Sequence, residues 1–339
     1  TDTVSLIFGG RFNASNVTLA DQSGERPELN GDHDFERFNP SVGVTWSPND
    51  DTNLYASYSE SSRAPTPIEL ACNETIADAF EARTGEDDFE CRLPNAFLAD
   101  PPLEQVVARS YEAGVRGEWN EINYRFGYFH TENQDDIIFQ STGRTTGLFK
   151  NVDETLRQGV ETAFAGTLGS FDWSLSYSYI EATFEDDFLT LSPNHDFAAD
   201  LNGNGDAAEI QVNKGDRIPG LPEHILKLGG DYRFAGGFTL GGEVVYNSDQ
   251  ALRADESNQL DTVGGYAVVN LRASYRVSER FELFARVTNL FDEDFENFGL
   301  LGEDPTELEP LEGVISNPSP RFLGIGAPRG GWVGLRVRI

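Results

Sequence analysis

The sequence has no methionine, only two cysteines and four histidines in 339 residues, and no long run of apolar side chains. A transmembrane helix needs about 18 consecutive apolar residues, so none is expected. Membrane β-strands remain allowed, because they are apolar only at alternate positions. Basic residues are also scarce: 25 Lys and Arg stand against 57 Asp and Glu, a net charge of -32. Nucleic acid is therefore excluded as an expected partner, since phosphate binding needs a basic surplus.

Enzyme signatures are missing as well. The sequence contains no G-x-S-x-G motif, no P-loop and no set of zinc ligands at a recognised spacing. We therefore expect a protein that is not an enzyme. A hydrophobic fraction of 38%, with 12% aromatic residues, excludes a disordered acidic chain.

The start of the chain lacks an initiator Met, and no basic stretch followed by an apolar one precedes the first alternating pattern. We interpret the sequence as a fragment or a processed product that has lost its N-terminal part.

The two cysteines, Cys72 and Cys91, are an even count at moderate separation. This pattern favours one disulfide in an oxidising compartment, and two reduced thiols are the alternative. A disulfide here would pin the predicted long loop 62–107 and contribute about 3 kcal/mol in the chain-entropy account.

What the sequence has in abundance is period-two alternation. Trp173, Leu175 and Tyr177 are apolar, whereas the intervening Ser174 and Ser176 are polar. Successive side chains of a strand point to opposite faces, so such a segment has one apolar and one polar face. No helical periodicity of useful length is present. We predict twelve strands near residues 3–18, 37–47, 52–61, 108–119, 122–133, 155–168, 171–184, 223–234, 237–248, 264–277, 280–291 and 330–339.

The predicted connections alternate between short and long. The short ones are 47–51, 119–121, 168–170, 235–236 and 278–279. The long ones are 19–36, 62–107, 134–154, 185–222, 249–263 and 292–329. Long loops at every second junction are typical of a membrane barrel, which has short periplasmic turns and long extracellular loops. The sequence thus predicts an all-β, antiparallel transmembrane β-barrel.

Strand parity extends this prediction. The last predicted strand follows a long extracellular loop, so it would run from the outside to the periplasm. Because the twelve strands alternate in direction, the first one would run outward. This fits the last twelve strands of a 22-stranded barrel, the size of plugged transporters. Residues 1–339 are then the C-terminal portion of one barrel, without its plug and early strands. A self-contained 12-stranded channel or pore is the alternative; a soluble sandwich or propeller would have loops of similar length at both ends.

Several segments resemble, in the same order, the C-terminal barrel of TonB-dependent receptors. They are residues 39–46 with 54–59, similar to a hairpin of the family; 62–70, similar to its "FRAP…EL" segment; 109–116, similar to its "S-Y-E-x-G" strand; Asn151 with 159–161, similar to "N…G-x-E"; and 266–292, similar to its penultimate hairpin with a "V-x-N-L-F-D" close. Ser62 replaces the usual aromatic residue, and Ile339 replaces the usual terminal Phe.

The resemblance implies a receptor of the bacterial outer membrane that imports a ferric siderophore or a similar nutrient complex. In that family TonB acts from the periplasm on an N-terminal plug domain. The implied partners are therefore the protein's own plug, the TonB complex through that plug, outer-membrane lipids including lipopolysaccharide, and a small nutrient ligand. The plug does not lie in these residues, so transport is not assigned to them alone.

One loop segment matches part of a calcium-binding loop. Oxygen ligands at alternate residues with Gly at the turn are typical of such a loop, but the bidentate Glu expected at its twelfth position is Gln211, and Glu209 comes two residues early. A flexible acidic loop tip is the alternative. We expect no certain cofactor, with calcium as the one candidate. Its ligands would be Asp200, Asn202, Asn204, Asp206 and Glu209.

The histidines and arginines offer weaker signals. His33, His130, His195 and His224 are scattered without metal-binding spacing; His33 and His195, in predicted extracellular loops, are expected to be solvated rather than to hold a haem or metal cargo. Arginines on the polar faces are expected to pair across strands with carboxylates such as Glu112, Glu118 and Glu282, the alternative being an anion-friendly lumen. The arginines expected on the polar faces of the predicted strands are Arg116, Arg125, Arg272, Arg276, Arg286, Arg336 and Arg338.

Overall fold

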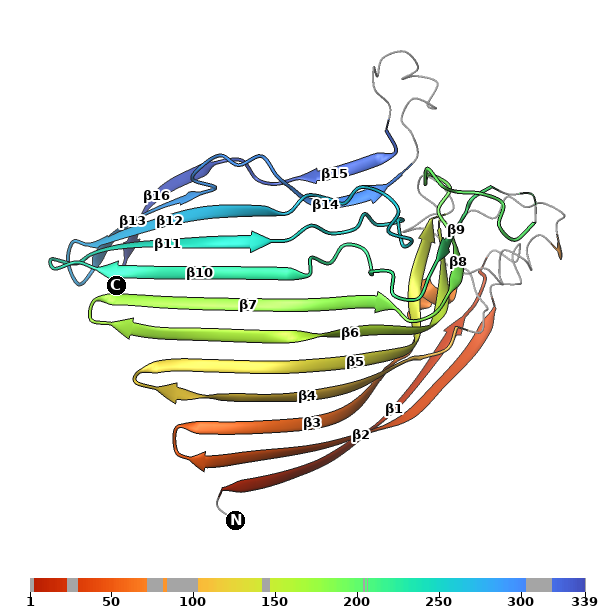
Figure 1. Cartoon of the computed structure of the whole chain (residues 1–339), viewed down its shortest axis with the longest axis horizontal. Coiled ribbons are helices and arrows are strands. Elements are labelled where there is room, and N and C mark those ends of the chain that lie inside the picture. The colour runs from red at the N-terminus through yellow and green to blue at the C-terminus, as the bar shows by residue number, and fades with distance from the viewer. Residues whose placement is uncertain are drawn as a thin grey trace.

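The computed structural model describes residues 3–22, 30–71, 82–83, 103–141, 147–203, 205, 207–302 and 319–338. Its main body is one antiparallel sheet of twelve strands, in which each strand pairs with the next sheet strand along the chain (Figure 1). All twelve predicted strands are confirmed. They are β1 (Val4–Leu19), β2 (Gly31–Asn49), β3 (Thr52–Arg63), β4 (Val106–Trp119), β5 (Ile122–Ser141), β6 (Gly147–Leu168), β7 (Phe171–Phe184), β10 (His224–Arg233), β11 (Phe238–Asn247), β12 (Tyr266–Arg276), β13 (Phe281–Thr288) and β16 (Gly330–Val337).

The short turns lie together at one end of the sheet and the long connections at the other (Figure 1). Asn120 and Glu121 join β4 to β5 with both φ angles positive, at 49° and 65°. A two-residue turn of this kind matches the right-handed twist of the strands that flank it. Gly236 and Gly237, with φ of 89° and 86°, turn the chain between β10 and β11.

Register carries the alternation from strand to strand. Val115 of β4 lies opposite Phe126 of β5, and Arg116 lies opposite Arg125. Because directly opposed side chains share a face, the apolar residues form one continuous face of the sheet and the polar residues the other.

Aromatic side chains mark both ends of the apolar face. Trp46, Trp119, Trp173, Tyr275 and Phe281 lie toward the short-turn end, and Tyr58, Tyr111, Tyr128 and Tyr179 lie toward the long-connection end. An apolar band between two aromatic girdles is the surface that a membrane barrel presents to lipid.

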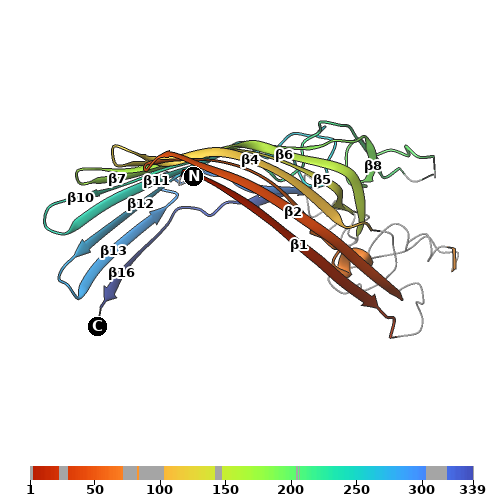
Figure 2. The same ribbon diagram turned by 90° about the horizontal axis from the view of Figure 1, so that it is seen from below.

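The sheet is strongly curved and its two edges remain apart (Figure 2). β1 pairs with β2 and β16 with β13, and no ladder joins β1 to β16 among the described residues. A self-contained 12-stranded barrel would require that ladder, so the described structure does not support the channel alternative.

Beyond the apolar band, the strands run further than expected. The predicted loop 134–154 is wrong for most of its length, because β5 continues to Ser141 and β6 begins at Gly147. Likewise, β2 begins at Gly31 instead of residue 37. Outside a bilayer both faces of a hairpin contact water, so the chain can keep its hydrogen-bond ladder without apolar alternation, and the sequence pattern ends before the strand does.

The long connections also contain structure that periodicity did not predict. Two small hairpins, β8 (Phe188–Leu191) with β9 (Glu209–Val212) and β14 (Glu296–Leu301) with β15 (Arg321–Ile325), lie at that end, together with the short helix α1 (Pro67–Ala71). None of the helices among the described residues has the length and apolar character needed to cross a membrane.

Buried apolar side chains gather in these connections and in the strand ends next to them. One cluster contains Val152, Phe184 and Val212, and another contains Leu252, Val263 and Leu301. We call the described residues of 185–222, 249–263 and 292–325 the loop cap. It has a protein core of its own, whereas Leu335 and Val333 on the sheet are more than half exposed.

Candidate functional site

The polar face of the sheet carries cross-strand ion pairs. Arg272 of β12 donates two hydrogen bonds to Asp231 of β10, at 2.8 and 2.5 Å. Arg125 lies 3.9 Å from Glu161. The expected pairing of Glu282 is confirmed, since Arg336 donates to it at 2.9 Å and Arg338 lies 3.7 Å away.

Other arginines on this face use different partners. Arg116 donates to the amide oxygen of Asn53 at 3.2 Å and lies over the ring of Tyr55. Arg286 lies over the ring of Trp332. Cross-strand pairing with carboxylates is therefore confirmed for Arg125, Arg272, Arg336 and Arg338, whereas Arg116 and Arg286 contact an amide or a ring instead. The expected pairings with Glu112 and Glu118 stay predictions.

A hollow of about 640 Å³ opens on the polar face between β4 and β12. Its charged lining consists of Arg116, Arg125, Lys227 and Arg272 with a single carboxylate, Glu243. A chain with net charge -32 thus carries a basic patch on the face that a closed barrel turns inward. Such a patch favours anionic groups, whether on a ligand or on a protein surface.

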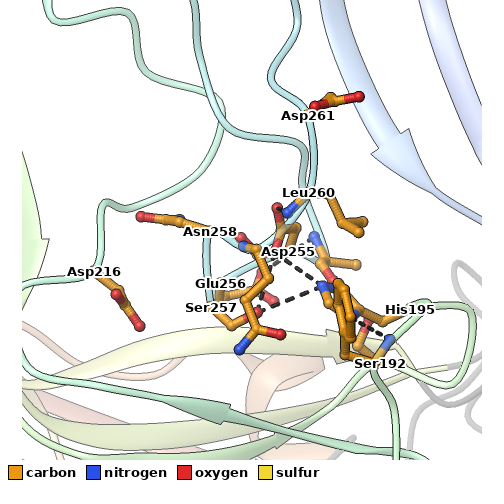
Figure 3. Close-up of polar contacts among 12 residues, drawn as sticks. Ser192, His195, Asp216, Asp255, Glu256, Ser257, Asn258, Leu260 and Asp261 are labelled. Atoms are coloured by element: carbon orange, nitrogen blue, oxygen red, sulfur yellow. Dashed lines mark hydrogen bonds and ion pairs between the residues drawn. The ribbon is translucent and has the colours of Figure 1, made fainter.

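In the loop cap, His195 and Asp255 join two connections that are distant in sequence (Figure 3). The His195 side chain is 0% exposed and that of Asp255 is 1% exposed. The backbone N–H of Phe197 donates to His195 Nδ1 at 3.1 Å, so Nε2 carries the hydrogen that is donated to Asp255 at 2.9 Å. The expectation that His195 is a solvated loop residue is therefore wrong, because its side chain is buried and both ring nitrogens form hydrogen bonds within the protein.

Asp255 has further donors. It accepts hydrogen bonds from the hydroxyl of Ser257 at 3.1 Å and from the backbone N–H groups of Gln259 and Leu260 at 3.0 and 3.1 Å. A buried carboxylate with this many donors is well satisfied, so it fixes the loop geometry. We call the set Ser192, His195, Asp255 and Ser257 the cap junction.

The cap junction does not have the geometry of a hydrolytic triad. The hydroxyl of Ser257 lies 3.5 Å from Nε2 of His195, the same nitrogen that bonds Asp255. A triad uses opposite ring nitrogens for the nucleophile and the carboxylate. Ser192, in turn, donates its hydroxyl hydrogen to the carbonyl of Ala254 at 2.6 Å, which is another tie between the two connections.

Among the described residues of the loop cap, Glu256 is the titratable group whose pKa departs furthest from its ordinary value. Burial raises the pKa of its carboxyl to about 7; backbone hydrogen bonds oppose this effect, and the charge of neighbouring Asp255 adds to it.

More backbone contacts tie the three parts of the loop cap together. Gly220 N–H donates to the carbonyl of Ala251 at 3.0 Å, and Arg253 N–H donates to the carbonyl of Gly299 at 3.0 Å. Asn258 accepts from Arg217 N–H and donates back to the Arg217 carbonyl. All three connections thus share one hydrogen-bonded framework around the two apolar clusters.

Two segments that carried the family resemblance have structural roles. After β3, Thr66 and Glu69 cap α1 reciprocally, and Arg63 bonds the Glu69 carboxylate at 2.7 Å. Burial acts in the opposite direction, but these hydrogen bonds from Arg63 and Thr66 lower the pKa of Glu69 below its ordinary value. Asn289, 3% exposed with φ of 50°, follows the last residue of β13 and donates hydrogen bonds to the backbone carbonyls of Glu293 and Ala327.

The remaining candidate residues are placed as follows. Cys72 and Cys91 lie outside the described residues, as do Asn204 and Asp206, so the disulfide stays a prediction. Asp200 accepts hydrogen bonds from the N–H groups of Gly203 and Gly205, and Glu209, on β9, accepts from Leu201 N–H at 2.9 Å. No group of three or more His, Cys, Asp or Glu side chains arranged for a metal occurs in the described part of the chain. Calcium binding by Asp200, Asn202, Asn204, Asp206 and Glu209 stays a prediction.

The other histidines lie on strands. His33 is on β2, which corrects its expected loop position. His130 bonds Gln158 and Glu132, both at 3.1 Å. His224 bonds the hydroxyl of Tyr177 at 2.9 Å. Sequence reasoning missed the cap junction, because nothing in the spacing of His195 and Asp255 signals that they meet.

A curved antiparallel sheet with a banded apolar face and a charged, hollowed opposite face defines the wall of an outer-membrane β-barrel. The family model described as "TonB dependent receptor-like, beta-barrel" matches residues 1–290, and the chain belongs to this family. Its location is the bacterial outer membrane. The relatives it resembles are receptors and transporters.

Curated relatives include the ferric-pyoverdine BN7/BN8 receptor of Pseudomonas putida, 24% identical over 303 residues, with 87% of this chain and 30% of the relative covered. The ferripyoverdine receptor of Pseudomonas aeruginosa is 23% identical over 317 residues, with 87% and 31% covered. The chain thus spans about a third of the length of these relatives.

Among solved structures, the copper transporter OprC aligns with a TM-score of 0.70 at 17% identity, covering 99% of this chain and 45% of that one. The ferric yersiniabactin uptake receptor FyuA from Yersinia pestis aligns with a TM-score of 0.65 at 16% identity, covering 99% and 43%. These likenesses show a shared fold.

Proposed function

We propose that this chain forms the C-terminal part of the barrel of a TonB-dependent receptor that imports a ferric siderophore or a similar nutrient complex. The observation that carries the proposal is the family match over residues 1–290 together with curated relatives named as ferric-pyoverdine receptors. The cargo class follows those names; the resemblance of fold to a copper transporter makes a different metal complex the alternative.

The open edges support the proposal that more strands complete the barrel. Among the described residues, β1 presents 16 residues that pair with no strand on one side, and a long exposed edge is prone to aggregate unless another strand covers it. Ten further strands would give 22, the size of barrels that hold a plug. The basic hollow on the polar face would then contact the plug or the passing ligand.

The partners proposed for the whole receptor follow from this assignment. They are its own N-terminal plug, the TonB complex through that plug, the small nutrient ligand, and the lipids and lipopolysaccharide around the barrel. The loop cap would contribute a fixed rather than a loose part of the extracellular surface that a ligand meets first, because it has its own buried core.

Uptake of iron-55 bound to pyoverdine tests the proposal. Disruption of the gene that encodes this chain should abolish energy-dependent uptake by cells grown without iron, and loss of TonB should do the same. Restoring the intact gene should restore uptake. Uptake that persists without TonB but disappears with the gene would instead identify a passive pore, and uptake unaffected by either loss would refute the proposed cargo.

A further inference from the structure

A second hollow opens on the apolar, membrane-facing side of the sheet. It lies at the short-turn end between β2 and β7 and has a volume of about 520 Å³. Its walls include Trp119, Ile122, Tyr124, Phe164 and Trp173. The volume falls within the range of about 300–1,000 Å³ that is usual for small-molecule sites. Membrane barrels turn this rim toward the periplasm, so the hollow would lie at the level of the inner leaflet of the outer membrane.

The register places these walls on one face. Tyr124 lies opposite Phe164, and Gly166 lies opposite both Ile122 and Trp173. A Cβ atom at Gly166 would lie 3.3 Å from Nε1 of Trp173 and 3.4 Å from the Ile122 side chain. The missing side chain therefore leaves room for the indole ring and keeps the hollow open.

Trp173 supplies a hydrogen-bond donor to this site. Its indole Nε1 is buried and has no hydrogen-bond partner among the described residues. A buried indole N–H usually finds an acceptor. An ester or phosphate oxygen of a lipid whose acyl chains lie against Trp119 and Phe164 would provide one.

Charge selects the head group. Asp51 and Glu118 line the hollow, Asp50 and Glu121 are the sequence neighbours of the lining residues Asp51 and Ile122, and no Lys or Arg is among the lining residues described. The hollow on the polar face has the reverse composition, with three arginines and a lysine. An acidic rim attracts an ammonium group and repels a head group that has only negative charge.

We propose that the outer-face hollow is a binding site for one phospholipid with an amine head group, such as phosphatidylethanolamine of the periplasmic leaflet. The acyl chains lie against Trp119, Phe164 and Trp173, the Trp173 N–H donates to a lipid oxygen, and the ammonium group lies near Asp51 and Glu118. The site is independent of the cargo and stands whether or not the receptor imports a siderophore.

Native mass spectrometry of the intact receptor, released from detergent after incubation with equimolar phosphatidylethanolamine and phosphatidylglycerol of matched acyl chains, tests the proposal. The wild type should retain one phosphatidylethanolamine in preference to phosphatidylglycerol. Replacing both indoles (Trp119→Leu with Trp173→Leu) should reduce retained lipid about fivefold or more. Trp46→Leu, an exposed belt tryptophan that does not line the hollow, is the matched control and should retain lipid as the wild type does.

A second variant separates head group from acyl chain. Asp51→Asn with Glu118→Gln should leave total lipid retention unchanged and bring the ratio of the two lipids close to one. Equal retention of both lipids by the wild type, no retained lipid at all, or unchanged retention in the double tryptophan variant would each overturn the proposal.

Discussion

The sheet and the loop cap are made by one chain but depend on different surroundings. The sheet exposes Leu335 and Val333 on its apolar face, whereas Leu252 and Val212 of the loop cap are both 0% exposed. Lipid tails are as apolar as leucine, so the sheet needs the bilayer to cover its side chains. The cap must build its own interior from neighbouring connections, and it adds a buried polar junction to do so.

The difference explains what each region is suited to do. Backbone ladders and a surrounding bilayer hold the sheet, which therefore tolerates almost any apolar side chain on its outer face. The cap depends on particular partners, such as Asp255 with its four donors, and it changes if one of them is lost. Under the proposed function, this fixed geometry of the cap is what a ligand would meet at the outer end of the barrel.

Removal of Asp255 should give the largest effect in the cap. Asp255→Ala leaves the Nε2 hydrogen of His195 and two backbone N–H groups buried without an acceptor, at about 1–3 kcal/mol for each group, so the local free energy of opening should fall by about 3–5 kcal/mol. Hydrogen exchange of residues 192–198 and 255–260 in the intact receptor measures this change. Asp261→Ala is the control, because that side chain is 99% exposed. Unchanged protection in Asp255→Ala would show that the junction does not hold the cap.

A single chemical change made in both regions tests their difference directly. Leu252→Ala should cost about 2–5 kcal/mol in the cap, since it creates a cavity beside Val263 and Leu301. Leu283→Ala, 44% exposed on the sheet, should cost less than about 1 kcal/mol, because lipid fills the space. The measurement is hydrogen exchange for the cap and reversible unfolding from lipid vesicles for the sheet. Equal costs would remove the distinction.

Two neighbouring residues of β7 test the two faces of the sheet. Leu175→Arg places a charge in lipid and should cost about 2–4 kcal/mol if the position lies near the bilayer centre. Ser176→Arg turns the same charge to the polar face, beside Lys227, and should cost little beyond mutual repulsion. Folding yield into lipid vesicles, read from the heat-dependent shift of the folded band on a gel, would rank the two variants. A worse result for Ser176→Arg would reverse the assignment of faces.

The sequence predicted the sheet well because the bilayer imposes one rule on every strand. Trp173, Leu175 and Tyr177 alternate with serines for the same reason that every other strand does, so twelve strands could be recognised without any tertiary information. The rule ends with the bilayer, which is why residues 134–141 and 147–154 were expected to be a loop and are strand.

The cap could not be predicted in this way. His195 and Asp255 are 60 positions apart, and each stands in a polar segment that resembles an ordinary loop. Their contact depends on how β8, β9 and the following connections fold together. A polar residue is buried there only because a residue of another connection forms a hydrogen bond with it. Such pairs produce no periodic pattern in the sequence.

The smallest expected effect concerns pH. Burial raises the pKa of Glu256 to about 7, above the ordinary value of 4.5 that applies when the cap is open. The closed cap therefore binds an extra proton between these values, and its stability is fully present below about pH 4.5 and is lost as the pH rises through 7. The charge of Asp255 opposes ionisation of Glu256, and the backbone hydrogen bond from Ala254 favours it. Because solvent screens part of the pKa shift, the loss of cap stability should be roughly 1–2 kcal/mol.

Hydrogen exchange of residues 249–263, corrected for the intrinsic rate and measured from pH 5 to pH 8, tests this prediction. In the wild type the cap should open more easily as the pH rises, and in Glu256→Gln this pH dependence should be much weaker. A pH dependence that is the same in both proteins would place the titrating group elsewhere, and a cap that tightens as the pH rises would contradict the sign of the shift.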